Sequence, residues 1–178
     1  MLDKDIKEVF FTNEQIVKRS EELGKQITED YKENPPLVVA LLRGSVPFLA
    51  ELIKHIDLDI QYDFMDVSSY DGTESTGDIK IVKDLDTSIK DMDILLVEDI
   101  IDTGRTISAV NALLMHRGAK SVKVVTLLDK PSRRVTECVA DYVGFEVANE
   151  FVVGFGMDFN QRYRCLPYIG ILKDELYK

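Results

Sequence analysis

Apolar residues recur at helical spacing in the first part of the chain. Thr12 and Gln15 have the spacing of a capping box, and the apolar residues that follow lie on one helical face as far as Tyr31. Pro35 and Pro36 cannot continue that helix. The pattern therefore predicts an amphipathic helix that begins at Thr12 and stops before the two prolines.

Apolar runs alternate with further helical patterns along the rest of the chain. Long uninterrupted runs are typical of strands that are covered on both faces, because neither face then needs polar residues. The predicted strands span residues 37–42, 60–67, 79–82, 93–97, 122–128, 142–145 and 151–153, and the predicted helices between them span residues 46–56 and 106–117. Gly118 suits the end of the second helix.

Strands that alternate with helices predict parallel β-α-β units and therefore an α/β fold. Ligands bind outside the carboxyl ends of the strands in such sheets, so the residues just after each strand are candidates for chemistry. The polar segment of residues 68–78, in which only Tyr70 is large, predicts a loop long enough to be functional.

Composition narrows the class of protein. The chain has 178 residues, which suits one domain, and 22 basic against 32 acidic residues give a net charge of −10. This charge disfavours binding to nucleic acid or to anionic membranes. No apolar run approaches the ~18 residues of a membrane span. The two cysteines form no disulfide framework, so we expect reduced thiols and a cytoplasmic location.

The densest chemical pattern spans residues 97–106. Three carboxylates, Glu98, Asp99 and Asp102, stand at or just past the end of a predicted buried strand. The residues that follow, opening onto a helix, are Thr103, Gly104, Arg105 and Thr106. N–H groups at a helix N-terminus bind phosphate readily, and the segment is too short for a P-loop. It therefore predicts a site for a single terminal phosphate.

The acidic pair admits more than one interpretation. Glu98 and Asp99 are adjacent, so an extended backbone points their side chains to opposite faces, although both can reach a ligand held over the strand end. Acidic oxygens near a phosphate indicate either recognition of hydroxyl groups or a bridging Mg²⁺ ion, and a sugar phosphate fits both. Alternatively Asp99 and Asp102 only cap a helix, but a cap needs one acid rather than three.

Residues 97–106 resemble the signature with which type I phosphoribosyltransferases bind 5-phosphoribosyl diphosphate (PRPP): an apolar strand, two acids, two apolar residues and Asp-Thr-Gly-x-Thr. Other segments resemble one branch of that family, the hypoxanthine-guanine phosphoribosyltransferases. These segments are Leu42-Arg43-Gly44, Ser69-Tyr70 with Ser75-Thr76-Gly77, Asp129-Lys130, Phe151-Val152, Asp158, Arg164 and residues 166–170. The resemblance runs from about residue 37 to residue 170.

At the sugar, the resemblance implies that residues 103–106 hold the 5′-phosphate. Glu98 and Asp99 would contact the ribose hydroxyls, directly or through water bound to Mg²⁺. Asp158 would be a ligand of a second Mg²⁺ ion, so the implied metal ligands are Glu98, Asp99 and Asp158. The metal would stabilise the negative charge that develops on the leaving diphosphate.

At the base, the resemblance implies that Asp102 lies near purine N7 and acts as general base or hydrogen-bond partner. Lys130 would read the 6-oxo group, since an ammonium group donates hydrogen bonds and accepts none. Phe151 would stack on the purine, and main-chain groups near Val152 and Asp158 would read its N1 and C2 edge.

Diphosphate and the polar loop complete the implied site. Arg43, Gly44 and Arg164 would receive the diphosphate, and family members often have a non-proline cis peptide at the turn before position 43. Ser69 and Tyr70 would contact the substrates when the loop closes and excludes water.

The resemblance implies a type I phosphoribosyltransferase fold, with a central parallel sheet flanked by helices and a small hood. We expect one domain over residues 1–178, with a core of about 35–146 and a hood from about 1–34 and 147–178. The expected reaction converts PRPP and hypoxanthine or guanine to IMP or GMP and diphosphate. We expect Mg²⁺ as cofactor, a homodimer or homotetramer, and no nucleic acid or membrane as partner.

Two alternatives stay open. One is a PRPP-sensing regulator that binds RNA or DNA, which the net charge of −10 disfavours. The other is a phosphoribosyltransferase for another base, namely a pyrimidine, adenine or xanthine. Lys130 disfavours adenine, whereas a preference for xanthine remains open because main-chain groups read part of the C2 edge.

Overall fold

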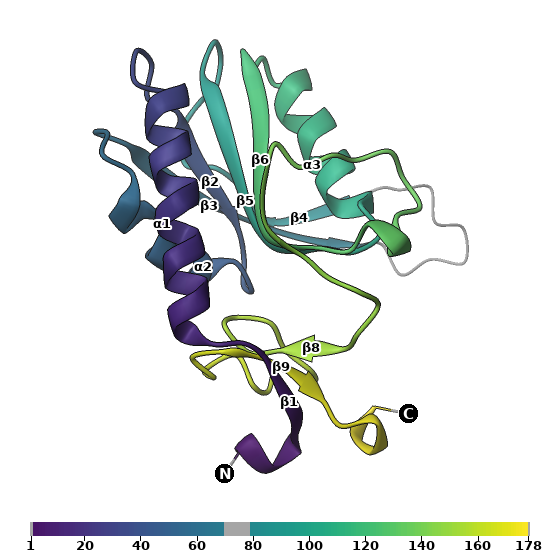
Figure 1. Ribbon diagram of the computed structural model, residues 1–178. Helices are drawn as coiled ribbons and strands as arrows, with labels where there is room; N and C mark the ends of the chain where they lie inside the picture. The colour runs from purple at the N-terminus through teal and green to yellow at the C-terminus, as the bar shows by residue number, and fades with distance from the viewer. Residues whose placement is uncertain (1, 70–78, 178) are drawn as a thin grey trace.

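The computed structural model describes residues 2–69 and 79–177. Its larger sheet has six strands in the order β4-β3-β2-β5-β6-β7 (Figure 1). Five of them are parallel, and β4 pairs antiparallel with β3 at one edge. The bounds are β2 Leu37–Leu41, β3 Gln61–Ser69, β4 Ile79–Lys83, β5 Asp93–Ile101, β6 Ser121–Asp129 and β7 Tyr142–Glu146. This parallel-rich sheet confirms the predicted α/β fold class.

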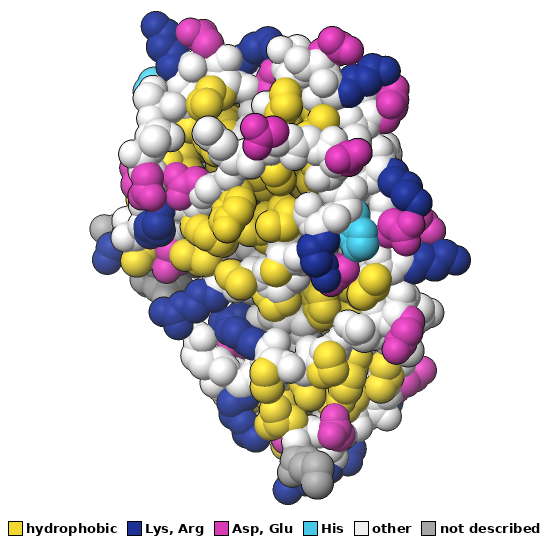
Figure 2. Space-filling view, turned by 90° about the vertical axis from the view of Figure 1, so that its left-hand side faces the viewer, with side chains coloured by type: hydrophobic (Ala, Val, Ile, Leu, Met, Phe, Trp, Pro, Cys, Tyr) yellow, Lys and Arg dark blue, Asp and Glu magenta, His cyan; other side chains and the backbone are white. Residues whose placement is uncertain are grey.

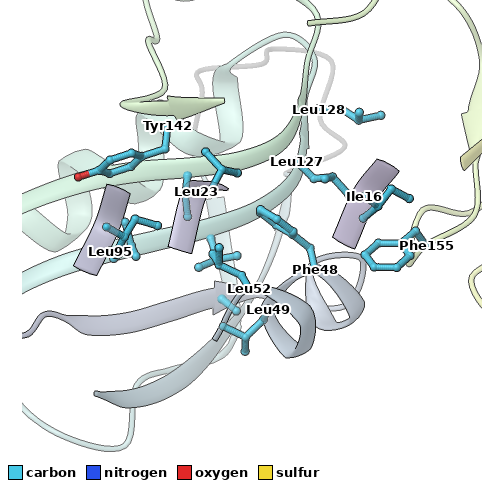
Figure 3. Close-up of a cluster of buried hydrophobic side chains, with 14 of the residues drawn as sticks. Ile16, Leu23, Phe48, Leu49, Leu52, Leu95, Leu127, Leu128, Tyr142 and Phe155 are labelled. Carbon is cyan, nitrogen blue, oxygen red and sulfur yellow. The ribbon is translucent and has the colours of Figure 1, made fainter. Parts of the chain in front are cut away.

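Helices cover both faces of the larger sheet because its central strands are apolar on both sides. Val38 and Leu95 belong to a core cluster that contains residues of α1 (Asn13–Asp30) and α2 (Val46–Leu52) (Figure 3). The next residues along the same strands, Val39 and Leu96, belong to a second cluster with α3 (Arg105–His116). The alternation of strand side chains thus distributes one apolar run between two hydrophobic layers.

The capping prediction at Thr12 is confirmed. The N–H of Gln15 donates to Thr12 Oγ1 at 3.3 Å, and the N–H of Thr12 donates to Gln15 Oε1 at 2.8 Å. Helix α1 begins at Asn13 and ends at Asp30, before the two prolines. Gly118, just after α3, has a φ of +89°, as expected for a residue that terminates a helix.

Two predicted boundaries were wrong. The segment of residues 46–56 is not one helix, because α2 ends at Leu52 and a 3₁₀ turn, η2 (Ile53–His55), follows. At this turn α1 approaches so closely that a Cβ on Gly24 would lie 2.6 Å from the His55 carbonyl oxygen. Strand β5 continues beyond the predicted end at residue 97, since it stays paired with β6 as far as residue 101.

A smaller antiparallel sheet joins the two ends of the chain. Its strands lie in the order β1-β9-β8, with bounds β1 Ile6–Phe11, β8 Val152–Val153 and β9 Ile169–Leu172. In the pairing of β1 with β9, Ile6 lies opposite Leu172. The sequence patterns predicted β8 but neither β1 nor β9. Figure 1 shows this sheet beneath the carboxyl ends of the large-sheet strands, where it forms the hood.

The hood packs on the core through both rings and backbone. Phe155 belongs to the same core cluster as Phe48 (Figure 3), and Phe11 of β1 stacks on Phe145 of β7 with ring centroids 4.1 Å apart. Gly156 has a φ of +100°, and a Cβ there would lie 1.9 Å from the carbonyl oxygen of Gly44. The boundaries predicted for core and hood stay a prediction, although α1 packs on the core side.

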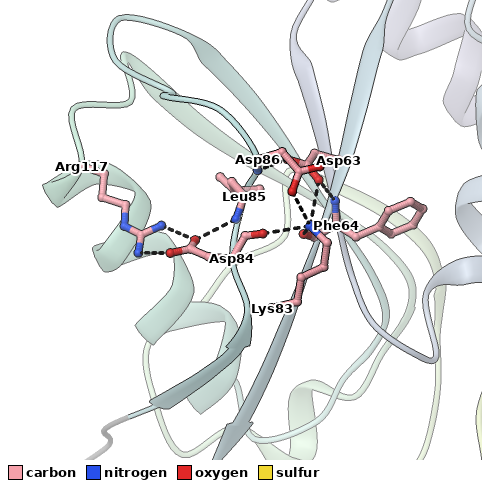
Figure 4. A network of polar contacts seen from close by, with 7 residues as sticks. All are labelled: Asp63, Phe64, Lys83, Asp84, Leu85, Asp86 and Arg117. Atoms are coloured by element: carbon pink, nitrogen blue, oxygen red, sulfur yellow. Dashed lines mark hydrogen bonds and ion pairs between the residues drawn. The ribbon is translucent and has the colours of Figure 1, made fainter.

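A polar network joins β3, β4 and α3 at the edge of the larger sheet (Figure 4). Lys83 Nζ lies 3.2 Å from a carboxylate oxygen of Asp63 and 3.2 Å from one of Asp86. Arg117 donates to both carboxylate oxygens of Asp84, at 2.5 and 2.8 Å. Within residues 2–69 and 79–177, no helix has both the length and the apolar character to cross a membrane.

Candidate active site

Two cavities adjoin at the carboxyl ends of the parallel strands. The smaller, about 260 Å³, is lined mainly by the turn between β5 and α3, and we call it the loop cavity. The larger, about 780 Å³, lies between the core and the hood, and we call it the hood cavity. Ile100 and Asp102 line both cavities, so Asp102 stands at their junction.

The loop cavity is shaped by a strand, a tight turn and a helix. Glu98, Asp102, Thr103 and Thr106 contribute polar groups to its lining. Gly104, which is also in the lining, has a φ of +82° and leads directly into α3. Only glycine adopts this conformation without strain. The cavity therefore meets the N-terminus of α3, whose first-turn N–H groups lack partners within the helix.

The carbonyl groups of this turn are occupied from the other side. Arg134 donates to the carbonyl oxygens of Ile101 and Asp102 at 3.0 and 2.6 Å, and the N–H of Val135 donates to that of Thr103 at 3.0 Å. The C=O and N–H of a trans peptide point in opposite directions. The N–H groups that follow Asp102 and Thr103 consequently point away from Arg134 and Val135. N–H groups gathered in this way bind anions such as phosphate.

Arg134 is itself held in place by Asp129, at the end of β6. The two side chains form an ion pair, and Arg134 is 15% exposed and Asp129 14% exposed. The Arg134 guanidinium thus connects the end of β6 to the turn after β5. This contact links β5 and β6, which are neighbours in the sheet, beside the loop cavity.

Glu98 and Asp99 line different cavities, as their alternation along β5 predicts. Glu98 lines the loop cavity and Asp99 lines the hood cavity. Burial raises the pKa of both carboxyl groups, that of Glu98 strongly. Gly44 packs against Asp99 so closely that a Cβ there would lie 1.7 Å from Asp99 Oδ2. The peptide bond between Leu42 and Arg43, just before this contact, is cis.

The hood cavity holds a buried cation. The Lys130 side chain is buried, and its Nζ donates to the carbonyl oxygen of Glu150 at 2.6 Å. Burial lowers the pKa of Lys130 below its usual value, while the nearby Asp102 opposes that shift. Arg133 Nε donates to Asp102 Oδ1 at 3.0 Å. The junction between the cavities therefore carries a carboxylate with two cations close by.

Aromatic rings form one wall of the hood cavity. Phe151 stacks on Tyr177, with centroids 4.6 Å apart and an angle of 22° between the ring planes. Phe159 meets Phe151 edge to face at 5.5 Å and 89°. Both Phe151 and Tyr177 line the cavity, together with Val152 and Met157.

Asp158 and Arg164 form a pair at the hood turn. Arg164 lies 2.8 Å from Asp158 Oδ1 and also donates to the Gly156 carbonyl oxygen at 2.7 Å. The N–H of Gln161 donates to Asp158 Oδ2 at 2.7 Å. Asp158 lines the hood cavity, and Arg164 lowers the pKa of the cavity-lining Asp99, against the larger effect of burial.

The carboxylates suit a hard cation that substrate oxygens help to bind. Among residues 2–69 and 79–177, no group of three or more His, Cys, Asp or Glu side chains is arranged to hold a metal ion. Mg²⁺ needs fewer, because it is usually held by one or two carboxylates together with substrate phosphates and water. Glu98 and Asp99 supply oxygen ligands of that kind beside the anion-binding turn. Their chemistry fits Mg²⁺ bound together with a phosphate ester.

A family model described as the phosphoribosyl transferase domain matches residues 8–160 of the chain. The matched range includes every residue of the loop-cavity lining. It also includes the hood-cavity residues from Asp99 to Asp158. The chain belongs to the phosphoribosyltransferase family.

Named relatives lie in one branch of the phosphoribosyltransferases. The chain is 57% identical to the hypoxanthine-guanine phosphoribosyltransferase of Lactococcus lactis, covering 99% of this chain and 96% of the relative. It is 54% identical to the enzyme of the same name from Streptococcus thermophilus, covering 99% of both. The structure of a hypoxanthine phosphoribosyltransferase from Staphylococcus aureus superposes with a TM-score of 0.96 at 49% identity, covering 99% of this chain and 97% of that chain.

The structure brings together most of the residues predicted for a phosphoribosyltransferase site. The loop cavity contains five of them, namely Glu98, Asp102, Thr103, Gly104 and Thr106. The hood cavity contains Asp99, Asp102, Lys130, Phe151, Val152 and Asp158. Arg43, Gly44, Arg105 and Arg164 are absent from both linings, although Gly44 packs on Asp99 and Arg164 pairs with Asp158. Arg43 and Arg105 are exposed.

The predicted loop of this phosphoribosyltransferase lies almost entirely outside the described residues. Tyr70 and the Ser75-Thr76-Gly77 segment fall in the part of the chain between residues 69 and 79. Ser69 is the last residue of β3. Strands β3 and β4, which precede and follow this part of the chain, pair antiparallel.

Several phosphoribosyltransferase site residues escaped the sequence analysis. Arg133 and Arg134 are consecutive cations after Asp129-Lys130 in an acidic chain, and this was a signal that could have been used. Lys7, Asp174 and Tyr177 also line the hood cavity. They come from the two ends of the chain, and no local pattern connects either end to residues 99–102.

Proposed function

We propose that this chain transfers the 5-phosphoribosyl group of PRPP to N9 of hypoxanthine or guanine, giving IMP or GMP and diphosphate. The observation that carries the proposal is the junction at Asp102. An anion-binding turn opens on one side of this carboxylate, and a cavity with a buried cation and an aromatic wall opens on the other. A nucleoside monophosphate has the same order of parts: phosphate, sugar and base.

The loop cavity supports binding of the 5′-phosphate. The N–H groups of residues 103–106, with the hydroxyl groups of Thr103 and Thr106, would donate to the phosphate oxygens. Glu98 and Asp99 would accept from the ribose hydroxyls between the two cavities. Arg164 and the turn at Arg43 and Gly44 would receive the diphosphate.

The hood cavity supports recognition of a 6-oxopurine. Lys130 Nζ uses one of its three N–H groups on the Glu150 carbonyl oxygen, and another would donate to O6. Adenine has an amino group at this position and offers no lone pair of that kind. Phe151 would stack on the purine, and main-chain groups near Val152 and Asp158 would read its N1 and C2 edge.

Asp102 would accept a proton from the purine as the glycosidic bond forms. The bond between C1′ and the diphosphate oxygen breaks with its electron pair on diphosphate, and purine N9 supplies the electron pair of the new bond to C1′. The ring then holds one proton in excess at N7, which the Asp102 carboxylate accepts. Arg133 donates to Asp102 Oδ1 at 3.0 Å, and the other carboxylate oxygen would accept the purine proton.

Mg²⁺ is part of this proposal. Glu98, Asp99 and, at a second ion, Asp158 would hold it with the substrate, and it supplies neutralisation of the charge that develops on the leaving diphosphate. Asp158 would then exchange part of its pairing with Arg164 for the ion.

The proposal includes a homodimer or homotetramer in the cytoplasm. Figure 2 shows hydrophobic side chains in several groups, with acidic and basic side chains around them, on the face at the left of Figure 1. Such groups favour burial between copies of the chain. Cys138 and Cys165 are both free thiols, which suits a reducing compartment.

The test is a spectrophotometric assay with PRPP, Mg²⁺ and, in turn, hypoxanthine, guanine, xanthine, adenine and uracil, each with and without EDTA. We expect turnover of hypoxanthine and guanine that EDTA abolishes, and none with adenine or uracil. Turnover of xanthine above both would assign the enzyme to another base. Retained PRPP binding without turnover of any base would favour a PRPP-sensing regulator of nucleic acid instead.

A further inference from the structure

The C-terminal end of the chain returns to the base side of the site. After β9, a 3₁₀ turn, η4 (Asp174–Leu176), leads to Tyr177. The N–H of Leu172 donates to the Phe151 carbonyl oxygen at 2.9 Å, and the N–H of Lys173 donates to that of Asp5 at 3.0 Å. The segment is therefore anchored to the backbone of Phe151 and to the N-terminal part of the hood.

Two rings hold the Phe151 ring in one orientation. Tyr177 covers one of its faces, with centroids 4.6 Å apart and the planes 22° from parallel. Phe159 abuts it nearly at a right angle, at 89° and 5.5 Å. Tyr177 thus fixes the plane of the Phe151 ring, and Phe159 restricts its rotation. The Phe151 side chain therefore loses little conformational freedom when another ring stacks on its remaining face.

The tyrosine that covers Phe151 is held in turn. Tyr177 Oη donates to Asp174 Oδ1 at 3.0 Å, within the same 3₁₀ segment. The tyrosine is half-buried, and both side chains line the hood cavity with Phe151. An aromatic residue at the end of the chain thus supports a ring at the start of β8, across the small sheet.

We propose that Tyr177 is a positioning residue for the purine base: it stacks behind Phe151 and fixes the face on which the 6-oxopurine binds. The inference rests on the proposed function, because it needs a purine in the hood cavity. It adds a residue from the C-terminal segment to the base site, so base affinity depends on the last turn of the chain. Phosphate binding, which uses the β5–α3 turn, does not.

The test compares Tyr177→Ala with Tyr177→Phe. Loss of one aromatic pair supports an increase on the order of tenfold in the KM for hypoxanthine in Tyr177→Ala. The KM for PRPP and kcat at saturating base should stay within about twofold of wild type, since Tyr177 is not part of the loop-cavity lining, where PRPP would bind. Tyr177→Phe keeps the ring and should restore most of the hypoxanthine KM.

Binding without turnover gives a second measurement. Calorimetric titration should show IMP bound about tenfold more weakly to Tyr177→Ala, with ribose 5-phosphate bound as in wild type. Tyr168→Ala is the matched control, because Tyr168 is in the same hood cluster but does not line the cavity. Its thermal unfolding midpoint should fall without a selective change in IMP affinity.

Four results would overturn the inference. A lower hypoxanthine KM in Tyr177→Ala would mean that the tyrosine occupies the purine position instead of supporting Phe151. An unchanged KM, an equal loss for both substrates, or failure of Tyr177→Phe to rescue would each remove the positioning role. The proposed function fails in a different way, namely if the wild-type protein turns over no 6-oxopurine.

Discussion

The loop cavity and the hood cavity share Asp102 but are assembled from different kinds of chain segment. Most of the loop-cavity lining comes from one continuous stretch, residues 98–107. The hood-cavity lining comes from five separate parts of the chain, namely Lys7, residues 99–102, 130–133, 149–158 and 174–177. The first needs β5, its turn and α3, together with Leu41, Leu42 and Val67 from the neighbouring β2 and β3 segments of the same sheet. The second exists only when both ends of the chain have packed together as the hood.

This difference predicts how each half of the site responds to change. A substitution in the loop cavity should alter the handling of PRPP, because its N–H and hydroxyl groups act locally. A substitution that loosens the hood should weaken base binding first, since several distant segments must keep their positions. A substitution of Asp102 should follow neither pattern, because this residue lines both cavities.

The largest effect is expected for Asp102→Asn. An amide cannot accept the purine proton, so kcat should fall by ~10²–10⁴. PRPP affinity, measured by calorimetry, should remain within about twofold because the turn and its N–H groups are intact. Asp86→Asn, an exposed acid in the network of Figure 4, is the matched control with unchanged kcat. Equal kcat in wild type and Asp102→Asn would exclude Asp102 as the base.

Lys130→Ala should affect the base more than the sugar phosphate. Removal of a charged hydrogen-bond donor costs ~1.5–3 kcal/mol, which corresponds to roughly a 10- to 150-fold increase in hypoxanthine KM. The KM for PRPP should change little, because Lys130 lines only the hood cavity. Steady-state kinetics with each substrate varied in turn measure both KM values. Parallel losses for both substrates would contradict the assigned role.

Thr106→Val should raise the KM for PRPP rather than the KM for hypoxanthine, and by less than Lys130→Ala raises the hypoxanthine KM. Valine keeps the shape but removes one hydroxyl donor to the phosphate, so the PRPP KM should rise roughly tenfold. The hypoxanthine KM should stay at the wild-type value. Ser108→Ala, two residues further along α3 and outside both cavity linings, is the control. An increase confined to the hypoxanthine KM would refute the separation of the two halves.

Asp63→Asn should leave catalysis unchanged and alter only stability. Burial opposes ionisation of Asp63, but the N–H groups of Asp86 and Phe64 and the Lys83 ammonium outweigh it and hold its pKa below the usual value. A lowered folded pKa stabilises the fold at a pH above about 4, and this contribution is lost as pH falls through the folded pKa.

Urea unfolding at pH 7 and at several values below 4 measures this effect. The wild-type midpoint should exceed that of Asp63→Asn at pH 7, and the difference should shrink as the medium becomes more acidic. Both KM values at pH 7 should match those of wild type, since Asp63 lines neither cavity. A difference that grows with acidity would reverse the sign of the contribution.

The same contrast explains what the sequence could predict. The buried strands were evident because both faces of β2 and β5 are apolar, and the chemistry of residues 98–106 was evident because those residues are contiguous. The division of Glu98 and Asp99 between two cavities follows from strand alternation alone. The family resemblance added Lys130, Phe151 and Asp158, which no spacing connects to β5.

The missed features depend on contacts between distant residues. Strand β1 has no regular alternation, and its partner β9 follows more than 150 residues later. Tyr177 and Lys7 reach the hood cavity only through that pairing. Arg134 supports the turn between β5 and α3 through backbone carbonyl groups, and sequence carries no pattern for a side chain that binds main-chain atoms.

The packing of Gly156 on Gly44 limits how the enzyme could be redesigned for bulkier purine analogues. Neither glycine lines the hood cavity, but this contact has no side chain to shorten, and a larger residue at either position would collide with the Gly44 carbonyl oxygen or with Asp99, which does line the cavity. Extra room must therefore come from lining residues that can be replaced, such as the exposed Lys7 and Asp174. Inhibitors that carry a substituent toward these exposed residues should fit, whereas those extended toward Asp99, which Gly44 backs, should not.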